Sequence, residues 1–219
     1  TTPSAVKLFR ELNAVLNGLD RLEVRGRDSA GVSVMIQFTQ HDFNALMRSL
    51  AKDGLTESYL ERCGRDMLAN LSIRRDPSSD PPDGNPVTLA FTYKIAAEIG
   101  SLGGNVDFLT GQIKIDPVFQ RAAVPAPENY SISSHTRWAS VGAITEANCH
   151  PVDNRLETDF PAQQGILHTC LNGDIDNYLG LRAELEKKGA IIPREITTDT
   201  KIIPLQIEKY LCEGYALDE

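Results

Sequence analysis

Two charged residues and one dipeptide could together bind a small amino acid and polarise an amide. Arg137 carries a planar guanidinium that can form two parallel hydrogen bonds with a carboxylate. Asp199 offers an anion that suits an ammonium group. Asn172 and Gly173 offer a side-chain amide and a backbone N–H, which are the kinds of donor that stabilise an oxyanion. Residues of these types are what a site that binds a zwitterion and cuts a carboxamide would need.

Each of these residues also has a simpler interpretation when it is taken alone. Arg137 would then be a surface ion pair, and Asn172-Gly173 would be a hairpin turn, because both residues tolerate positive φ. Asp199 stands between two threonines ahead of a helical segment, which is typical of a helix cap. The interpretation as a site therefore depends on the motifs taken together.

Five motifs follow one another along the chain in a fixed order. They are Arg25-Gly26-Arg27-Asp28-Ser29-Ala30-Gly31, His135-Thr136-Arg137-Trp138-Ala139, Asn148-Cys149-His150-Pro151, Asn172-Gly173 and Thr198-Asp199-Thr200. In this order they resemble the glutamine amidotransferase domain of class II, of the N-terminal-nucleophile hydrolase superfamily. His-Thr-Arg-Trp-Ala is the most specific motif and points to the sugar-phosphate aminotransferase branch. The similar segments span residues 19–35 and 132–212.

The resemblance implies how glutamine would be held. Arg137 would bind the α-carboxylate of L-glutamine, and Asp199 would bind its α-ammonium group. Trp138 and Ser140 match residues that line the glutamine pocket of the family. Taken alone, Trp138 would more often be a core or rim residue.

The resemblance also implies the chemistry. The Asn172 side chain and the Gly173 N–H would form the oxyanion hole, and Arg25 and His150 would support the pocket. Taken alone, His150 would be a hydrogen-bonded loop residue and Arg25-Gly26 the entry to a strand. The family hydrolyses glutamine to glutamate and ammonia, without a cofactor or a metal, and passes the ammonia to an acceptor such as a sugar phosphate.

The catalytic nucleophile of the family is an N-terminal cysteine, whereas this sequence begins with Thr1. The family's first strand would precede the helix expected from Pro3, so the sequence is expected to lack that strand. Thr1 is a weak substitute, because Pro3 begins a helix instead. Cys149 and Cys170 adjoin motif residues, but Cys170 is expected in a buried strand, where a free cysteine behaves as a small hydrophobe.

A second difference concerns the glutamine-binding loop. Val141 stands where the aminotransferase branch usually has a histidine, so one hydrogen-bonding group is lost. Two functions therefore stay open. The chain is a glutaminase domain, or it is a non-catalytic binding or regulatory module that has kept the pocket.

The composition of the chain argues against several other classes of function. The 219 residues carry a net charge of -8 with 41% hydrophobic residues, which indicates a globular chain and argues against a nucleic-acid surface. The sequence has no apolar run that approaches about 20 residues, so a membrane partner is not expected. Four widely spaced cysteines without a C-x-x-C pair indicate a reduced, cytoplasmic protein without zinc.

The elements expected from periodicity mix helices and strands without β-α alternation, which favours an α+β fold. The expected helices are 3–22, 41–72 in two pieces divided at Gly54, 177–188 and 199–212, the last disturbed at Pro204. The expected strands are 32–38, 87–97, 105–115, 131–138 and 164–171. The second and third of these would form a hairpin around Gly103-Gly104, and 76–86 would be a loop.

The resemblance implies a four-layer αββα sandwich. We expect one amidotransferase domain over residues 1–219, with an enlarged insertion at about 41–128. Partners would be L-glutamine and an acceptor domain of synthase or isomerase type, either elsewhere in the protein or on another chain. A second copy of the chain stays open as a partner.

Overall fold

The computed structural model describes residues 2–64, 69–76, 85–96, 102–125, 127, 129–138, 142–156 and 165–216. These residues contain a four-stranded antiparallel sheet in the order β2-β3-β1-β4. Its strands are β1 (Ser29–Phe38), β2 (Ser72–Asp76), β3 (Val87–Ala96) and β4 (Asn129–Arg137). A small second sheet pairs β5 (Val152–Asp153) with β6 (His168–Thr169). The expected mixture of helices with antiparallel strands is confirmed.

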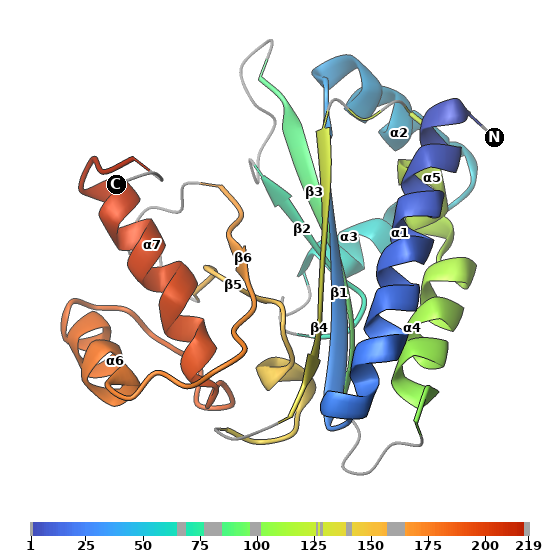
Figure 1. The fold of residues 1–219 in the computed structure, drawn as a ribbon. Coiled ribbons are helices and arrows are strands. Elements are labelled where there is room, and N and C mark those ends of the chain that lie inside the picture. The colour runs from blue at the N-terminus through green and yellow to red at the C-terminus, as the bar shows by residue number, and fades with distance from the viewer. Residues whose placement is uncertain are drawn as a thin grey trace.

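Helices lie on both sides of the main sheet. The chain before residue 125 forms α1 (Pro3–Leu22), α2 (Gln40–Lys52), α3 (Thr56–Gly64), α4 (Gly104–Ile115) and α5 (Pro117–Ala122). The later part forms α6 (Tyr178–Lys187) and α7 (Ile202–Cys212). In Figure 1, α1 and α4 cover one face of the sheet, and β5, β6, α6 and α7 lie on its other side. None of the described helices combines the length and the apolar character needed to cross a bilayer.

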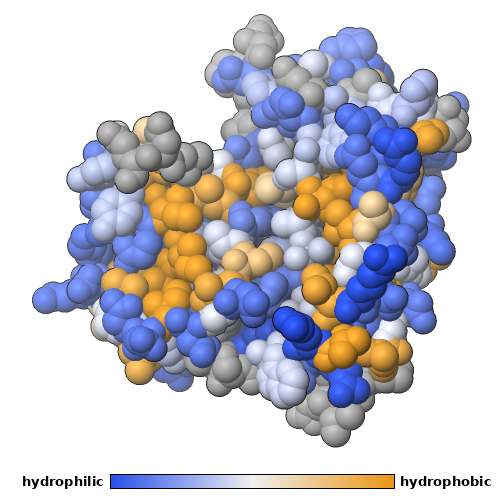
Figure 2. All heavy atoms as spheres, in the orientation of Figure 1, coloured by the Kyte–Doolittle hydropathy of each residue, from blue (hydrophilic) through white to orange (hydrophobic). Residues whose placement is uncertain are grey.

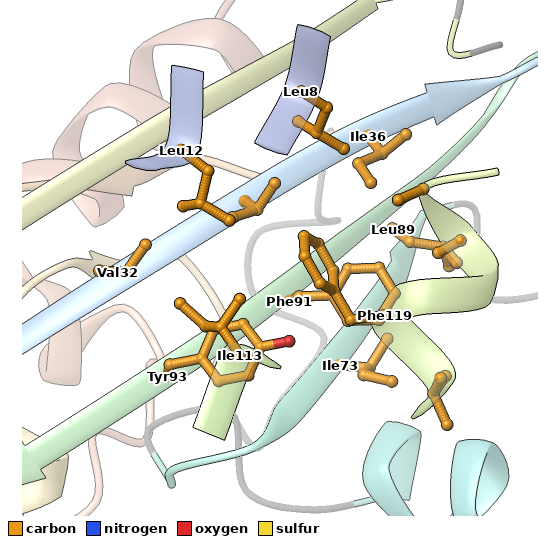
Figure 3. Close-up of a cluster of buried hydrophobic side chains, with 14 of the residues drawn as sticks. Leu8, Leu12, Val32, Ile36, Ile73, Leu89, Phe91, Tyr93, Ile113 and Phe119 are labelled. Carbon is orange, nitrogen blue, oxygen red and sulfur yellow. The ribbon is translucent and has the colours of Figure 1, made fainter. Parts of the chain in front are cut away.

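The first helix forms as its sequence predicts. Thr2 accepts a hydrogen bond from the Ala5 N–H at 3.2 Å, and Pro3 occupies the first turn, where an N–H would have no helical partner. The apolar face of α1 packs on the main sheet and on α4 and α5, around Leu8, Leu12, Val32, Phe91 and Phe119 (Figure 3). Burial of this face, rather than intrinsic propensity, is what stabilises such a helix.

Strand alternation separates an apolar face of the sheet from a polar one. On β1, every second residue from Ala30 to Phe38 is buried in the core beneath the helices. Ser29, Gly31 and Ser33 therefore face the opposite side, because successive side chains of a strand alternate. In β4, Arg137 lies opposite Ser29 and His135 opposite Gly31. The sheet thus presents the candidate residues to the side that carries β5, β6 and α7.

The hairpin expected around Gly103-Gly104 is wrong, because residues 104–115 form α4. The carboxylate of Glu23, which is fully buried, accepts hydrogen bonds from the Gly103 N–H at 2.9 Å and from the Asn105 N–H at 3.1 Å. A carboxylate at this position satisfies free amides at the start of the helix and complements its dipole. The acceptor lies 80 positions earlier, so the local sequence did not reveal it.

Most other elements agree with expectation, with smaller corrections. Gly54 has a positive φ of 71° between α2 and α3, as a helix stop requires. The second helix was expected to reach residue 72, but α3 ends at Gly64, residues 69–71 form a turn and β2 begins at Ser72. Pro204 falls in the first turn of α7 and so does not break it. Strand 164–171 shortens to His168–Thr169, and Cys170 is exposed rather than buried. Most of the loop 76–86 lies outside the described residues.

Residues 41–128 are an integral part of the fold. They hold α2, α3, β2, β3, α4 and α5, and β3 pairs with β1 along the full length of both strands. Whether this range is an insertion stays a prediction. On the other side of the sheet, the half-buried residues Ile203, Ile207 and Leu211 lie along α7, and Figure 2 shows apolar side chains over this helix.

Candidate functional site

Arg137 ends β4 as a buried cation rather than a surface ion pair. Its side chain is 4% exposed, and its Nη1 donates to the Ala143 carbonyl at 3.2 Å. Burial lowers the pKa of its guanidinium, although nearby Cys149, Asp199 and Asp28 act to raise it. Because Asp199 acts on this group electrostatically, the two charges lie in one neighbourhood although 62 positions separate them in the chain.

Asp199 connects two of the motifs. It begins a short 3₁₀ helix, Asp199–Lys201, and is 3% exposed. Its Oδ2 accepts a hydrogen bond from the Ile175 N–H at 2.7 Å, and the Thr200 hydroxyl donates to its Oδ1 at 3.3 Å. Ile175 lies two residues after Gly173. The carboxylate therefore ties the chain just after Asn172-Gly173 to the Thr-Asp-Thr motif.

Two motif glycines, and a third that follows the second motif, show how closely the segments approach one another. A Cβ on Gly26 would lie 2.9 Å from the carbonyl carbon of Arg137, and one on Gly31 would overlap the carbonyl oxygen of His150. A Cβ on Gly142 would lie 2.9 Å from the Thr198 nitrogen. Real Cβ contacts are not this short, so only glycine permits these approaches. The first motif is thus packed closely against the second and third, and Gly142 is packed against the fifth.

His150 lies under this cluster as a neutral side chain. It is 4% exposed, its ring centroid is 4.7 Å from that of His135, and its Nε2 is 3.4 Å from the Thr198 hydroxyl. Burial lowers its pKa to about 3, and the charges of His135, Arg137 and Lys94 contribute. A neutral imidazole here can pack and accept hydrogen bonds without adding a charge near Arg137.

Cys149 is not an activated nucleophile. It is fully buried, its Sγ donates to the Ala30 carbonyl at 3.0 Å, and burial raises the pKa of its thiol. A nucleophilic cysteine needs an accessible thiolate. Cys149 therefore behaves as a small buried residue.

Asn148 was not singled out from the sequence, yet it makes the densest contacts near the site. Its side chain is fully buried. Its Oδ1 accepts from the N–H groups of Thr197 and Thr198 at 2.7 and 2.8 Å, and its Nδ2 donates to the Thr145 hydroxyl and the Glu195 carbonyl. The sequence feature that could have identified Asn148 is its position as the first residue of the Asn-Cys-His-Pro motif.

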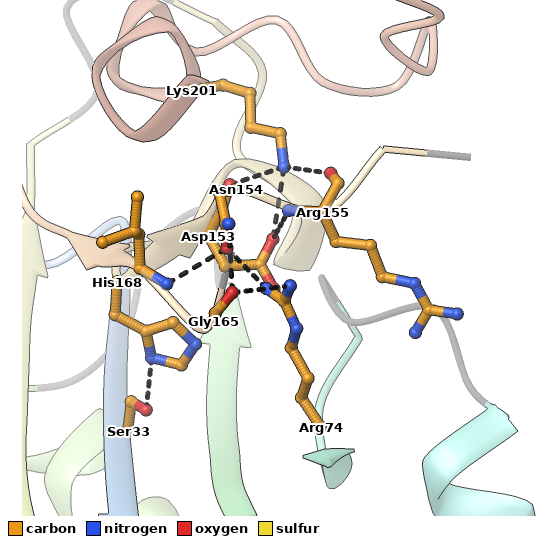
Figure 4. Close-up of polar contacts among 9 residues, drawn as sticks. Ser33, Arg74, Asp153, Asn154, Arg155, Gly165, His168 and Lys201 are labelled. Atoms are coloured by element: carbon orange, nitrogen blue, oxygen red, sulfur yellow. Dashed lines mark hydrogen bonds and ion pairs between the residues drawn. The ribbon is translucent and has the colours of Figure 1, made fainter. Parts of the chain in front are cut away.

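A second polar cluster joins the two layers beside the site. Lys201 Nζ donates to the carbonyls of Asp153 and Arg155 at 2.6 and 2.7 Å, and it lies 3.2 Å from Asp153 Oδ1 (Figure 4). Arg74 from β2 donates to Asn154 Oδ1 at 2.5 Å. Burial alone would raise the pKa of Asp153, but the charges of Lys201, His168 and Arg74 lower it. The cluster anchors the segment after Asp199 to β5.

The remaining predicted residues are exposed or lie outside the described part of the chain. Trp138 follows Arg137 and is 72% exposed. Asn172 and Gly173 are exposed in the turn after β6, and Arg25 is exposed ahead of β1. Ser140 and Val141 lie outside the described residues, so the structure does not place them. Within the described part of the chain, no group of three or more His, Cys, Asp and Glu side chains is arranged for a metal ion.

The chain shares sequence similarity with proteins of known name. The glutamine–fructose-6-phosphate aminotransferase of Streptomyces coelicolor is 38% identical over 200 residues, which cover 91% of this chain and 20% of that protein. The chain is similar to glutamine–fructose-6-phosphate aminotransferases. The predicted resemblance is therefore confirmed.

Aminotransferases of the same name from two archaea are similar over shorter segments. That of Methanothermobacter thermautotrophicus is 42% identical over 39% of this chain and 13% of its own length. That of Sulfurisphaera tokodaii is 37% identical over 46% of this chain and 15% of its own length. The chain thus spans a fifth or less of these aminotransferases. No family model matches the chain. No solved structure matches it either.

Proposed function

We propose that this chain contributes the glutamine site of a class II glutamine amidotransferase, which hydrolyses L-glutamine to glutamate and ammonia. The observation that carries the proposal is the hydrogen bond from the Ile175 N–H to Asp199 Oδ2, within the electrostatic reach of Arg137. It supports a single site, because it joins the Thr-Asp-Thr motif to the chain two residues after Asn172-Gly173, near the arginine. The similarity to glutamine–fructose-6-phosphate aminotransferases supports glutamine as the ligand.

In this proposal, each end of glutamine meets a group of opposite charge. Arg137 binds the α-carboxylate through its planar guanidinium. Asp199 binds the α-ammonium group through carboxylate lone pairs beyond those that Ile175 and Thr200 occupy, because an ionised carboxylate accepts about four hydrogen bonds. Trp138 and Ser140 border the pocket. His150 stays neutral beneath it and supports its floor.

The carboxamide end meets the exposed turn. A cysteine thiolate, which the resemblance implies as the N-terminal residue of the family domain, attacks the carboxamide carbon. The Asn172 side chain and the Gly173 N–H stabilise the oxyanion that forms, an interaction worth about 3 kcal/mol for one donor. The C–N bond then breaks, the protonated nitrogen leaves as ammonia, and water hydrolyses the thioester to glutamate.

The arrangement of layers in Figure 1 supports the αββα sandwich of N-terminal-nucleophile hydrolases. The layers would be α1 with α4, the main sheet, the β5-β6 sheet, and α6 with α7. Residues 41–128 would be an insertion that adds α2, α3 and β2 and contributes Arg74 to the cluster between the layers. A sugar phosphate, bound by a synthase or isomerase domain in the rest of the protein or on another chain, would accept the ammonia.

Calorimetric titration with L-glutamine tests the site. We expect binding, and we expect Arg137→Ala to weaken it by about 1.5–3 kcal/mol, which is at least about tenfold in Kd, because a hydrogen bond to a charged group is lost. Arg121→Ala is the matched control, since Arg121 pairs with Asp53 on the far side of the main sheet. Equal glutamine affinity in the wild type and in Arg137→Ala would refute the assignment of Arg137.

A further inference from the structure

The loop that carries Asp199 is fixed from both sides by buried side chains. Before Asp199, the amide of Asn148 binds the N–H groups of Thr197 and Thr198 and the carbonyl of Glu195. After it, Lys201 is bound to the carbonyls of Asp153 and Arg155. Both anchors are at most 1% exposed. The position of the Asp199 carboxylate therefore depends on these two anchors as well as on Ile175 and Thr200, which contact it directly.

Asn148 is the anchor most directly coupled to the carboxylate. The Thr198 N–H that it binds at 2.8 Å belongs to the residue immediately before Asp199. Its own backbone ends a 3₁₀ turn, Glu146–Asn148, which leads into Cys149 and His150. One side chain thus fixes the distance between the Asn-Cys-His-Pro motif and the Thr-Asp-Thr motif.

We propose that Asn148 is a positioning residue that sets the affinity of the site for the α-ammonium group of its ligand, acting through Asp199. This inference rests on the function proposed above. Removing the Asn148 amide leaves the buried N–H of Thr198 and the part-buried N–H of Thr197 without this acceptor. Such groups cost free energy, so the loop moves to pair them elsewhere and carries Asp199 with it. An ion contact with the ammonium group weakens as that distance grows.

The test compares two ligands, L-glutamine and glutaramate, which is glutamine without its α-amino group. The ratio of their dissociation constants measures the ammonium contact alone. We expect Asn148→Ala to lower the preference for glutamine by at least about tenfold, as Asp199→Ala does. The double variant Asn148→Ala/Asp199→Ala should show no further loss, because both changes remove the same contact.

Asn105→Ala is the matched control. Asn105 is also a buried asparagine, with its Nδ2 bound to the Arg27 carbonyl at 3.1 Å, but it stands on α4 on the helical face of the sheet. We expect it to lower the melting temperature without changing the ligand preference. A merely structural role for Asn148 predicts the same behaviour for Asn148→Ala, and that result would overturn the inference.

Thr145→Val keeps the test decisive if Asn148→Ala fails to fold. Thr145 is exposed, and its hydroxyl accepts a hydrogen bond from Asn148 Nδ2 at 2.8 Å. Removing this hydroxyl frees one end of the Asn148 side-chain amide without leaving a buried cavity. We expect the preference for glutamine to fall by about threefold. An unchanged preference would count against Asn148. A wild type that binds neither ligand would refute the proposed function instead, so the two failures are distinguishable.

Discussion

Gly31 contributes to stability because its lack of a side chain leaves room for a neighbouring segment. Gly31 on β1 lies against the carbonyl of His150, where a Cβ would overlap the oxygen atom. We expect Gly31→Ala to lower the free energy of unfolding by about 1–3 kcal/mol or more, because the layer that carries His150 must shift. Urea unfolding followed by circular dichroism measures this change.

The same change from glycine to alanine at Gly18 should raise the free energy of unfolding instead of lowering it. Gly18 is exposed in the middle of α1, and a Cβ there would meet nothing within 4 Å. Alanine should stabilise the helix by about 0.5–1 kcal/mol, since glycine loses more backbone entropy on folding. If both alanine variants changed stability by the same amount, close packing between β1 and His150 would not be the cause.

The charged residues of the candidate site were predictable from the motifs taken together, but the residues that hold them in place were not. The types of Arg137 and Asp199 indicated which groups they could bind, and the structure buries both in one neighbourhood. The role of Asn148 depends on the segment 197–198 lying against it, nearly 50 positions away. No local pattern encodes such a contact. The binding roles of Trp138, Asn172 and Gly173 stay predictions.

Among the elements, those with a clear period and a local cap were predictable. For α1, the apolar spacing, the Thr2 cap and Pro3 all lie within the helix or next to it. For α4, the buried residues Val106, Leu109 and Ile113 do follow a helical spacing, but the paired glycines and the β-branched residues suggested a hairpin. The buried carboxylate of Glu23, which lies outside α4, accepts hydrogen bonds at the start of this helix and so favours helix over hairpin.

A buried ion pair links α3, β3 and α5. Arg62 donates to both oxygens of Asp116 at 2.8 Å, Tyr93 donates to Asp116 Oδ2 at 2.6 Å, and Asp116 also caps α5. We expect Asp116→Ala to cost about 3–5 kcal/mol, because it leaves a buried cation without its partner. Tyr93→Phe should cost only about 1 kcal/mol, since one hydrogen bond is lost.

Glu186→Ala is the control for this pair, and the same denaturant titration measures all three variants. Glu186 pairs with Arg182 on the surface of α6, and its side chain is 43% exposed. Its loss should cost at most about 0.5 kcal/mol. An Asp116→Ala protein as stable as Glu186→Ala would contradict the interpretation that the buried pair holds the three elements together.

At the scale of the whole molecule, the two faces of the main sheet are held by different forces. The helical face is apolar, and its stability comes from the burial of hydrocarbon. The opposite face meets β5 and β6 through serines, histidines and charged side chains, as in the contact of Ser33 with His168 at 2.5 Å (Figure 4). Strand alternation predicted that these faces would differ, but it could not show that a second layer would cover the polar one.

This polar interface makes stability depend on pH. Burial lowers the pKa of His150 to about 3, and it lowers the pKa of His168 to about 4 although Asp153 opposes the shift. Both histidines stay neutral in the folded state, while the unfolded chain takes up protons near pH 6.5. Their contribution to stability is therefore complete above pH 6.5 and is lost as the pH falls toward 4 and 3.

Between pH 7 and pH 5 the loss should reach about 2 kcal/mol for each of the two histidines. Urea unfolding at a series of pH values measures it, because urea carries no charge that would screen the interface. His168→Gln and His150→Gln should each reduce the slope, and part of it should remain in the double variant, because burial also lowers the pKa of His135. His41→Gln is the control, since its side chain is 85% exposed and should leave the slope unchanged. A stability that stays constant over this range would mean that protons reach both imidazoles in the folded protein, and that the interface between the two layers is wet.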